Sequence, residues 1–400
     1  MRILYFNFMA DLHGSSIGST IKAKELLSHL EALGHAVTYQ WRYGEARPAG
    51  SRRPKNRMTG PVILKRMLFT PKEILKNITE YRREAKAIKR IRPDVVIARL
   101  DAYKISTALL CRRHHIPFVL EADGAMSFEW LEFHNQERKL NRFCLMAFER
   151  YNFHLAQKIF VQSNVTRDYY IQLLGRQEKI AVITNAADVR AVTVPATRLR
   201  QDLGIPQTSV VCGFMGSFHY WHDAAALRRI TENLLLNHAE LCFLFIGQGG
   251  VSADSIRKEF SQRPWSHRAV FIDHVPHDQI QNYINIFDIA LAPYMRQRLF
   301  YYSPVKIFEY MAYGKAVVTA PFGQVEELIQ DRENGLFYNP DQEGDLETKV
   351  TELVLKPDLR FRLGAKAKEL IAGAHTWSHK AKQLETLCWE VCRNANQTKP

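Results

Sequence analysis

One stretch of the chain, residues 303–320, carries residue types that suit the binding of a phosphate and a sugar diol. Ser303 is a good N-cap, and Pro304 fits a first helical turn because it has no N–H to leave unpaired. Free N–H groups at a helix start bind anions, and the Glu309 carboxylate, one turn further on, can accept hydrogen bonds from a diol. The spacing predicts half of a nucleotide-binding site. The alternative is an ordinary helix on which Glu309 and Lys306 are solvated.

The predicted helix has two unlike faces and a clear end. Gly314 suits the left-handed turn that ends a helix, and the apolar run 316–320 predicts a buried strand directly after it. One face of the helix carries the apolar residues Ile307, Phe308 and Met311, and the other carries Lys306, Glu309, Tyr310 and Tyr313. The stretch is therefore a helix that runs into a strand.

Composition places the chain among globular proteins. Its 400 residues, 46% hydrophobic and 24% charged, suffice for two or three domains with separate cores. No run approaches the roughly 20 apolar residues of a membrane-spanning helix, and the start lacks the features of a signal peptide. Six scattered cysteines without Cys-x-x-Cys spacing favour reduced thiols and give no zinc pattern. We expect a cytoplasmic protein without a metal site, which meets a membrane only peripherally.

Short apolar runs alternate with helical segments from residues 3–8 onward, which predicts an α/β fold with doubly wound parallel sheets. Polar residues at the carboxyl ends of such strands line the ligand crevice. Arg99, Glu121 and Asp123 hold these positions, with an ion pair or a loop cap as the alternative. Gly14, in the turn after the first strand, allows a ligand to approach the backbone closely, although a tight turn without a ligand would use it too.

The positive charge of the chain is concentrated in one segment. The net charge is +14, and residues 42–92 hold 16 Lys and Arg against four Glu. A basic helix is predicted from Pro71 to Arg90, with apolar side chains at helical spacing: Ile74, Leu75, Ile78 and Tyr81. Such a helix suits an anionic membrane surface. A solvated helix packed on its own sheet is the alternative. Nucleic acid is not favoured, because no recognised reading module is present.

The sequence of residues 303–318, SPVKIFEYMAYGKAVV, resembles the donor-binding segment of the retaining glycosyltransferases of the GT-B fold, glycosyltransferase family 4. The resemblance implies two Rossmann-like domains that face each other across a cleft. Residues 1–189 would form the acceptor-binding domain with the basic insertion 42–92, and 190–207 the linker. Residues 208–375 would form the nucleotide-sugar-binding domain, and 376–400 a helix returning to the first domain.

The resemblance also implies site residues. Glu309 would hold the ribose of the donor, Lys306 would supply positive charge, and Glu121 and Asp123 would lie near the transferred sugar or the acceptor. We expect the catalytic side chains among these four. The remaining donor contacts would come from Gly14, Ser15, Gly216, Ser217, His222, Gly247, His274, Val275, Ser303, Pro304 and Val305.

Two departures from the family pattern stand out. Tyr301 occupies the place of a glutamate that often touches the transferred sugar, eight positions before Glu309. Where many members carry an Arg and a Lys that grip the diphosphate, this chain has Ser217 and, about six positions on, His222 or Asp223. More of the phosphate charge would then fall on Lys306 and the helix start.

We therefore predict a retaining hexosyltransferase that needs no metal ion in the chemical step and no cofactor besides its nucleotide-sugar. Its acceptor would be a glycan or lipid-linked intermediate of surface polysaccharide or glycoconjugate synthesis, reached from the cytoplasm or the inner face of the cell membrane. A sugar-nucleotide epimerase of the same fold and a nucleotide-sugar-binding protein without turnover remain as alternatives.

Overall fold

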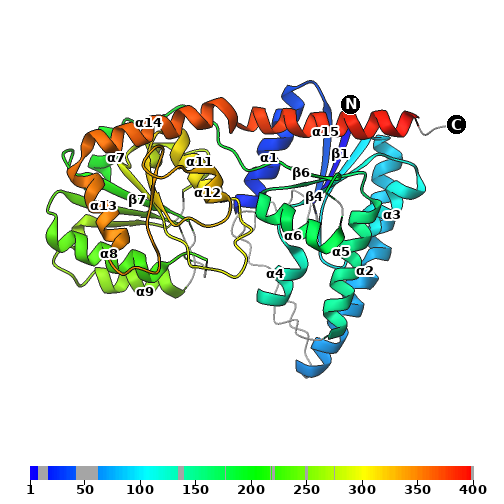
Figure 1. Cartoon of the computed structure of the whole chain (residues 1–400), viewed down its shortest axis with the longest axis horizontal. Helices are drawn as coiled ribbons and strands as arrows, with labels where there is room; N and C mark the ends of the chain where they lie inside the picture. Colours follow the sequence, from blue (N-terminus) through cyan, green and yellow to red (C-terminus); the bar gives the residue numbers. More distant parts are fainter. Residues whose placement is uncertain are drawn as a thin grey trace. The chain divides into compact units, whose positions relative to one another are not determined.

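Two parallel β-sheets organise the chain (Figure 1). The computed structural model describes residues 1–7, 17–41, 62–133, 139–175, 177–216, 218, 221–247, 251–273 and 275–397. These divide into two compact units. Unit 1 comprises Met1–Thr184 and Trp377–Pro400, and unit 2 comprises Asn185–Thr376. Each unit contains one six-stranded sheet within its described part, so the predicted class, a GT-B pair of doubly wound domains, is confirmed.

The sheet of unit 1 has the strand order β2-β1-β3-β4-β5-β6, and every neighbouring pair is parallel. Its strands are β1 (Arg2–Asn7), β2 (Ala36–Trp41), β3 (Val95–Arg99), β4 (Phe118–Ala122), β5 (Lys158–Val161) and β6 (Ile180–Val182). Its helices are α1 (Ile17–Ala32), α2 (Val62–Ile91), α3 (Ser106–Arg113), α4 (Met126–Phe133), α5 (Lys139–Leu155), α6 (Asn164–Leu174) and α15 (Trp377–Gln397). The order reverses beside β1, which is where ligands bind in open α/β sheets.

Helix α15 completes unit 1 although it lies at the other end of the chain. It packs against α1, and His35, after α1, donates a 2.8 Å hydrogen bond from Nε2 to Glu385 Oε1 of α15. Several α15 side chains are buried: Trp377, Ala381, Leu384, Leu387, Cys388 and Val391. The predicted return of this last helix to the first domain corresponds to this arrangement.

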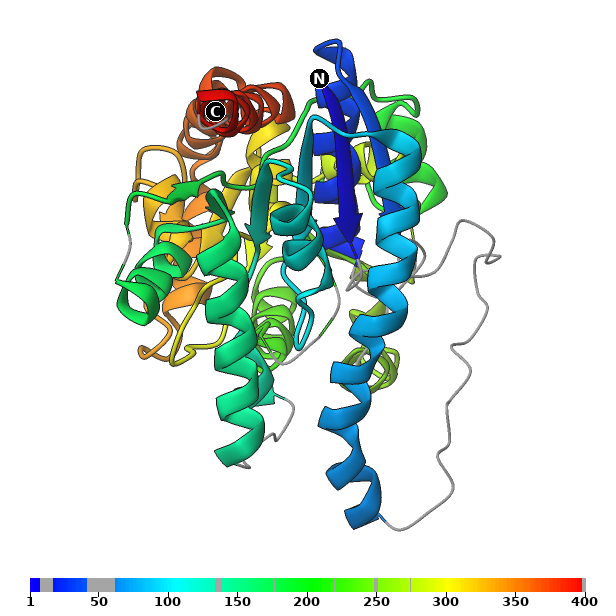
Figure 2. The same cartoon turned by 90° about the vertical axis from the view of Figure 1, so that its right-hand side faces the viewer.

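Residues 62–91 of the basic segment form one long helix, α2, which extends beyond the sheet with α5 alongside (Figure 2). The two helices are joined by a 2.8 Å hydrogen bond from Thr70 Oγ1 to Asn141 Oδ1. A helix start at Pro71 was predicted, but α2 already begins at Val62 and carries Pro71 inside it. Residues 42–61 of the predicted insertion lie outside the described residues. No described helix combines the length and apolar composition that a membrane-spanning segment needs.

The sheet of unit 2 has the order β12-β11-β10-β7-β8-β9, again all parallel. Its strands are β7 (Val210–Met215), β8 (Leu241–Ile246), β9 (Ala269–Ile272), β10 (Ile289–Ala292), β11 (Ala316–Thr319) and β12 (Leu336–Phe337). Its helices are α7 (Ala196–Asp202), α8 (Ala224–Asn237), α9 (Val251–Phe260), α10 (Ile280–Asn285), α11 (Val305–Ala312), α12 (Gln324–Leu328), α13 (Asp345–Leu355) and α14 (Pro357–Ala374), with a 3₁₀ turn at Ser266–Arg268.

Residues 185–207, which were predicted partly as first domain and partly as linker, belong to unit 2. Side chains of unit 2 hold this segment. The Arg190 backbone N–H donates to the hydroxyl of Tyr313 at 2.8 Å. The Asn282 side chain accepts from the N–H groups of Thr193 and Val194. The segment is therefore fixed on α10 and α11 rather than spanning free between two domains.

Candidate functional site

Helix α11 follows the loop after β10 and carries the two charged residues of the predicted site, Lys306 and Glu309. Ser303 was predicted as the N-cap of this helix, but the N-cap is Pro304, and no side chain caps the helix. The hydroxyl of Ser303 instead accepts a 3.1 Å hydrogen bond from the backbone N–H of Asn185, whose side-chain amide donates to the Ser303 carbonyl. Ser303 thus anchors the loop before the helix. The N–H groups at the helix start are left without a side-chain cap, and Val305 begins the helix.

Lys306 lies half-buried in unit 2 beside two aromatic side chains. Its Nζ donates a 2.8 Å hydrogen bond to His222 Nε2 and lies 4.5 Å from the centre of the Phe214 ring. Burial lowers the pKa of Lys306 to about 7, although the nearby Glu309 carboxylate acts to raise it. A cation held in this way gains much from a bound anion, because an anion would restore the charged form.

The other residues of the β7–α8 connection have distinct positions. His222 is buried and pairs with Tyr294 through an isolated β-bridge. Asp223 caps α8 by accepting a 2.8 Å hydrogen bond from the N–H of Ala226. Of the two candidates for the place of the usual cation, His222 is therefore the one that contacts Lys306.

Two glycines permit the loops after β7 and β8 to approach closely. A Cβ on Gly216 would lie 2.5 Å from Lys306 Nζ, and a Cβ on Gly247 would lie 2.3 Å from the carbonyl oxygen of Gly216. Both residues have positive φ, +140° and +137°, which favours glycine. The predicted site residues Gly216, His222, Gly247 and Lys306 are thus brought to one end of the sheet.

Glu309 faces a histidine that the sequence did not single out. Its Oε1 lies 3.0 Å from His277 Nε2, in the loop between β9 and α10. Val275, predicted near the base, lies in the same loop and packs partly buried against the core of unit 2. Tyr310, predicted on the polar face of α11, is instead fully buried, because its hydroxyl accepts a 2.7 Å hydrogen bond from the Met215 N–H.

In unit 1, Glu121 and Asp123 form a buried ionic cluster. Lys22 Nζ lies 3.0 Å from Glu121 and also bonds to Asp123, and Arg99 lies 2.9 Å from Asp123. Tyr5 donates a 2.6 Å hydrogen bond to Glu121. The network has the geometry of the ion-pair alternative, in which these carboxylates stabilise the ends of β1, β3 and β4.

The surroundings shift the pKa values of these two carboxyl groups in opposite directions. Burial acts to raise the pKa of Asp123, but Arg99 and Lys22 outweigh it and hold that pKa below its usual value. Burial and the neighbouring Asp123 raise the pKa of Glu121. Asp123 is therefore the more acidic member of the pair, and its carboxylate contacts both Lys22 and Arg99.

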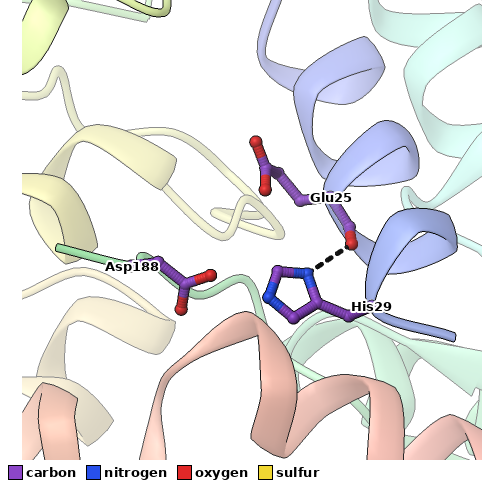
Figure 3. Close-up of side chains that lie close together, drawn as sticks. All are labelled: Glu25, His29 and Asp188. Carbon is purple, nitrogen blue, oxygen red and sulfur yellow. Dashed lines mark hydrogen bonds between the residues drawn. The ribbon is translucent and has the colours of Figure 1, made fainter. Parts of the chain in front are cut away.

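A pair of possible metal ligands lies on α1, where His29 Nδ1 donates to the Glu25 carbonyl oxygen at 2.8 Å (Figure 3). Asp188, drawn with them, belongs to unit 2. Within the described part of either unit taken alone, no three His, Cys, Asp or Glu side chains gather closely enough to hold a metal ion.

Comparison with known proteins bears on this arrangement. A family model described as Glycosyltransferase Family 4 matches residues 18–191, and one described as Glycosyl transferase-like matches residues 228–386. Sucrose-phosphate synthase from Thermosynechococcus elongatus has a similar structure, with a TM-score of 0.72 at 15% identity over 98% of this chain and 99% of that one. Both halves of the chain thus match glycosyltransferase family models, and the fold is that of the GT-B glycosyltransferases.

Two further comparisons are informative. The D-inositol 3-phosphate glycosyltransferase of Corynebacterium jeikeium is 24% identical over 53% of this chain and 52% of its own length. The chain thus spans about half the length of the curated relatives it matches. The structure of Anabaena Alr3699/HepE in complex with UDP and glucose has a TM-score of 0.65 at 17% identity, covering 97% of this chain and 99% of that one.

Not every predicted site residue can be placed in the structure. Gly14, Ser15, Ser217 and His274 lie outside the described residues. Tyr301, in the place of the second glutamate, is buried, and its ring packs 4.2 Å from that of Tyr302. Sequence reasoning missed His277 and Asn185. The only signal for His277 was its place shortly after a predicted strand, and none marked Asn185 as the partner of Ser303.

Proposed function

We propose that this protein is a retaining hexosyltransferase that takes its sugar from a nucleotide-sugar. The observation that carries the proposal is the pair on α11: a half-buried Lys306 bonded to His222 and, one turn on, Glu309 with a carboxylate bonded to His277. A cation and a carboxylate at this spacing fit the two ends of a nucleoside diphosphate. The complex of Anabaena HepE with UDP and glucose supports a nucleotide-sugar as the ligand class.

On the phosphate side, Lys306 and the start of α11 would hold the diphosphate. Ser303, Pro304 and Val305 form the turn into this helix, and the N–H groups at a helix start favour anions. Gly216 and Gly247 would let the diphosphate approach the loops after β7 and β8. Lys306 and His222 would take up the charge of the leaving diphosphate, so that the step needs no metal ion.

On the ribose side, the Glu309 carboxylate would accept hydrogen bonds from the diol, and the loop holding Val275 would meet the base. The acceptor hydroxyl would attack from the face that the diphosphate leaves, which retains the anomeric configuration. Positioning and charge stabilisation would supply the rate enhancement. Glu121 and Asp123 would shape the acceptor side indirectly, through the cluster with Lys22 and Arg99.

We further propose that the acceptor is a glycan or lipid-linked intermediate of surface polysaccharide synthesis, met at the inner face of the cell membrane. Helix α2 supports a membrane surface as partner. Leu75 and Ile78 are 61% and 54% exposed, and every exposed charged side chain from Thr70 to Ile91 is cationic: Lys72, Arg82, Lys86, Lys89 and Arg90. Such a face suits anionic lipid.

Isothermal titration calorimetry with UDP-, ADP- and GDP-linked hexoses tests the proposal. We expect one donor class to bind wild type at micromolar to sub-millimolar concentration, and Glu309→Ala to weaken that binding without lowering the melting temperature. Glu369→Ala, which removes an exposed carboxylate of α14, is the matched control and should bind as wild type does. Absence of binding at millimolar donor would refute the proposal, and loss of fold in Glu309→Ala would make Glu309 structural.

A further inference from the structure

Three side chains of unit 2 form a hydrogen-bonded row that ends at Glu309. Arg190 donates from Nη1 to His277 Nδ1 at 3.2 Å, and His277 Nε2 lies 3.0 Å from Glu309 Oε1. The three residues come from different parts of the unit. Arg190 lies in the segment that enters it, His277 in the loop after β9, and Glu309 in the second turn of α11.

The partners of His277 determine its tautomer. A guanidinium has only N–H donors, so His277 Nδ1 must accept the hydrogen bond from Arg190. The ring proton is then on Nε2, which donates to the Glu309 carboxylate. In this arrangement His277 is a neutral imidazole that offers Glu309 one directed N–H.

The backbone of Arg190 is held in place by the Tyr313 side chain. The Tyr313 hydroxyl accepts a 2.8 Å hydrogen bond from the Arg190 N–H and donates one of 3.1 Å to the Arg190 carbonyl. Tyr313 is the residue directly after α11, one turn beyond Glu309. Tyr313 and Glu309, at the end of α11 and within it, thus hold the two ends of the row.

We propose that His277 is a positioning residue for the donor: its Nε2–H fixes one oxygen of the Glu309 carboxylate, so that the carboxylate is already turned to meet the ribose diol. This inference rests on the proposed function, because it assigns Glu309 to the ribose. A donor that finds Glu309 ordered does not have to order this flexible side chain on binding.

The exposure of the pair favours this role over one in stability. The side chains of His277 and Glu309 are 28% and 13% exposed. A pair that water still reaches contributes less to folding than a fully buried one, because solvent screens it and its ordering costs entropy. Its effect is expected in the affinity for a ribose-containing ligand.

Two substitutions separate the Nε2 contact from the mere presence of a polar side chain. The amide nitrogen of glutamine can reach the position of Nε2, whereas that of asparagine reaches only the position of Nδ1. We expect His277→Asn to weaken the binding of a nucleoside diphosphate about tenfold, the effect of losing one hydrogen bond to a charged group. His277→Gln should stay within about threefold of wild type. His238→Asn is the matched control, because His238 pairs with Glu240 at the exposed end of α8.

The probes are UDP, ADP and GDP, of which the tightest for wild type is used, its 2′,3′-dideoxy analogue, and inorganic pyrophosphate. The loss in His277→Asn should appear with the ribonucleotide and be absent with the dideoxy analogue and pyrophosphate, which lack the diol. In a Glu309→Ala background, His277→Asn should cause no further loss. Calorimetry gives the affinities, and a melting curve checks the fold.

Three results would overturn the inference: unchanged ribonucleotide affinity in His277→Asn, an equal loss with all three probes, or a full loss in the Glu309→Ala background. If wild type binds none of the three nucleotides at millimolar concentration, the proposed function itself fails and the role of His277 falls with it. Wild-type binding combined with a neutral His277→Asn overturns the positioning role alone.

Discussion

Lys306 and His222 are hydrogen-bonded to one another at 2.8 Å although they come from different loops of the second sheet. Lys306 belongs to the first turn of α11, and His222 lies just before α8. The family pattern places diphosphate-binding cations in the loop before α8. In this chain Lys306 of α11 can supply that charge instead, and His222 of that loop can orient the Lys306 ammonium group.

The lowered pKa of Lys306 predicts a pH-dependent affinity. Its pKa of about 7 means that the ammonium is charged below pH 7 and neutral above it. A diphosphate favours the charged form, so binding takes up a proton and should weaken about tenfold from pH 6 to pH 8. The reference is Lys306→Met, since the terminal phosphate also titrates near pH 6. Wild type should bind better than the variant at pH 6 and approach it by pH 8, measured by calorimetry. A constant difference across this range would contradict the prediction.

A second prediction follows from the close approach of Lys306 Nζ to Gly216. A Cβ at this position would lie 2.5 Å from Nζ, and φ of +140° disfavours any side chain. Gly216→Ala should therefore displace Lys306, lower donor affinity at least tenfold, and cost about 1–3 kcal/mol of stability. In Gly373→Ala, on α14, the added methyl meets nothing within 4 Å. That control should stabilise the protein by about 0.4–1 kcal/mol and leave binding unchanged.

Asp123 can be assigned by comparing stability with activity. In the cluster, Asp123 faces Lys22 and Arg99, so Asp123→Asn leaves buried positive charge poorly compensated. We expect a loss of about 3–5 kcal/mol in urea unfolding. Lys22→Met in the same chain should recover part of it, because one uncompensated cation is then removed. Normal stability with lost transfer activity would instead make Asp123 a direct participant in the reaction.

The outward face of α2 predicts lipid dependence. Leu75→Ser with Ile78→Ser should reduce recovery with anionic vesicles in a flotation assay, and neutral vesicles should recover little of either protein. Each exposed cation near the surface adds about 1 kcal/mol, so added salt should also reduce recovery. Leu355→Ser, a change at a 65% exposed leucine of α13, is the control. Equal recovery with both vesicle types would remove the membrane from the proposed function.

The fold was predictable because its signals are local. Each buried strand reads as a short apolar run, and Gly314 has the left-handed φ of +67° that its place at the end of α11 required. Pro71 misled the prediction of α2, because proline usually starts a helix. Its ring lies at an exposed position inside α2, so the cost there is a missing N–H.

The candidate site was predictable only in part, because its contacts join distant residues. Lys306 and Glu309 follow from the spacing on one helix, but the bonds to His222 and His277 depend on how loops meet at a sheet edge. Ser303 has the right type and place for an N-cap, yet Asn185 takes its hydroxyl. The pairing of Asp123 with Lys22 was likewise invisible, since α1 and β4 are far apart in the sequence.

The docking of α15 on α1 has a consequence for the order in which the two units fold during synthesis. Unit 2 is continuous from Asn185 to Thr376, so a ribosome delivers all of it before Trp377 emerges. The face of α1 that α15 covers therefore stays exposed until the whole of unit 2 has been translated. We expect the unit that begins the chain to reach its native state last, and to be the one that needs chaperone protection as it is made.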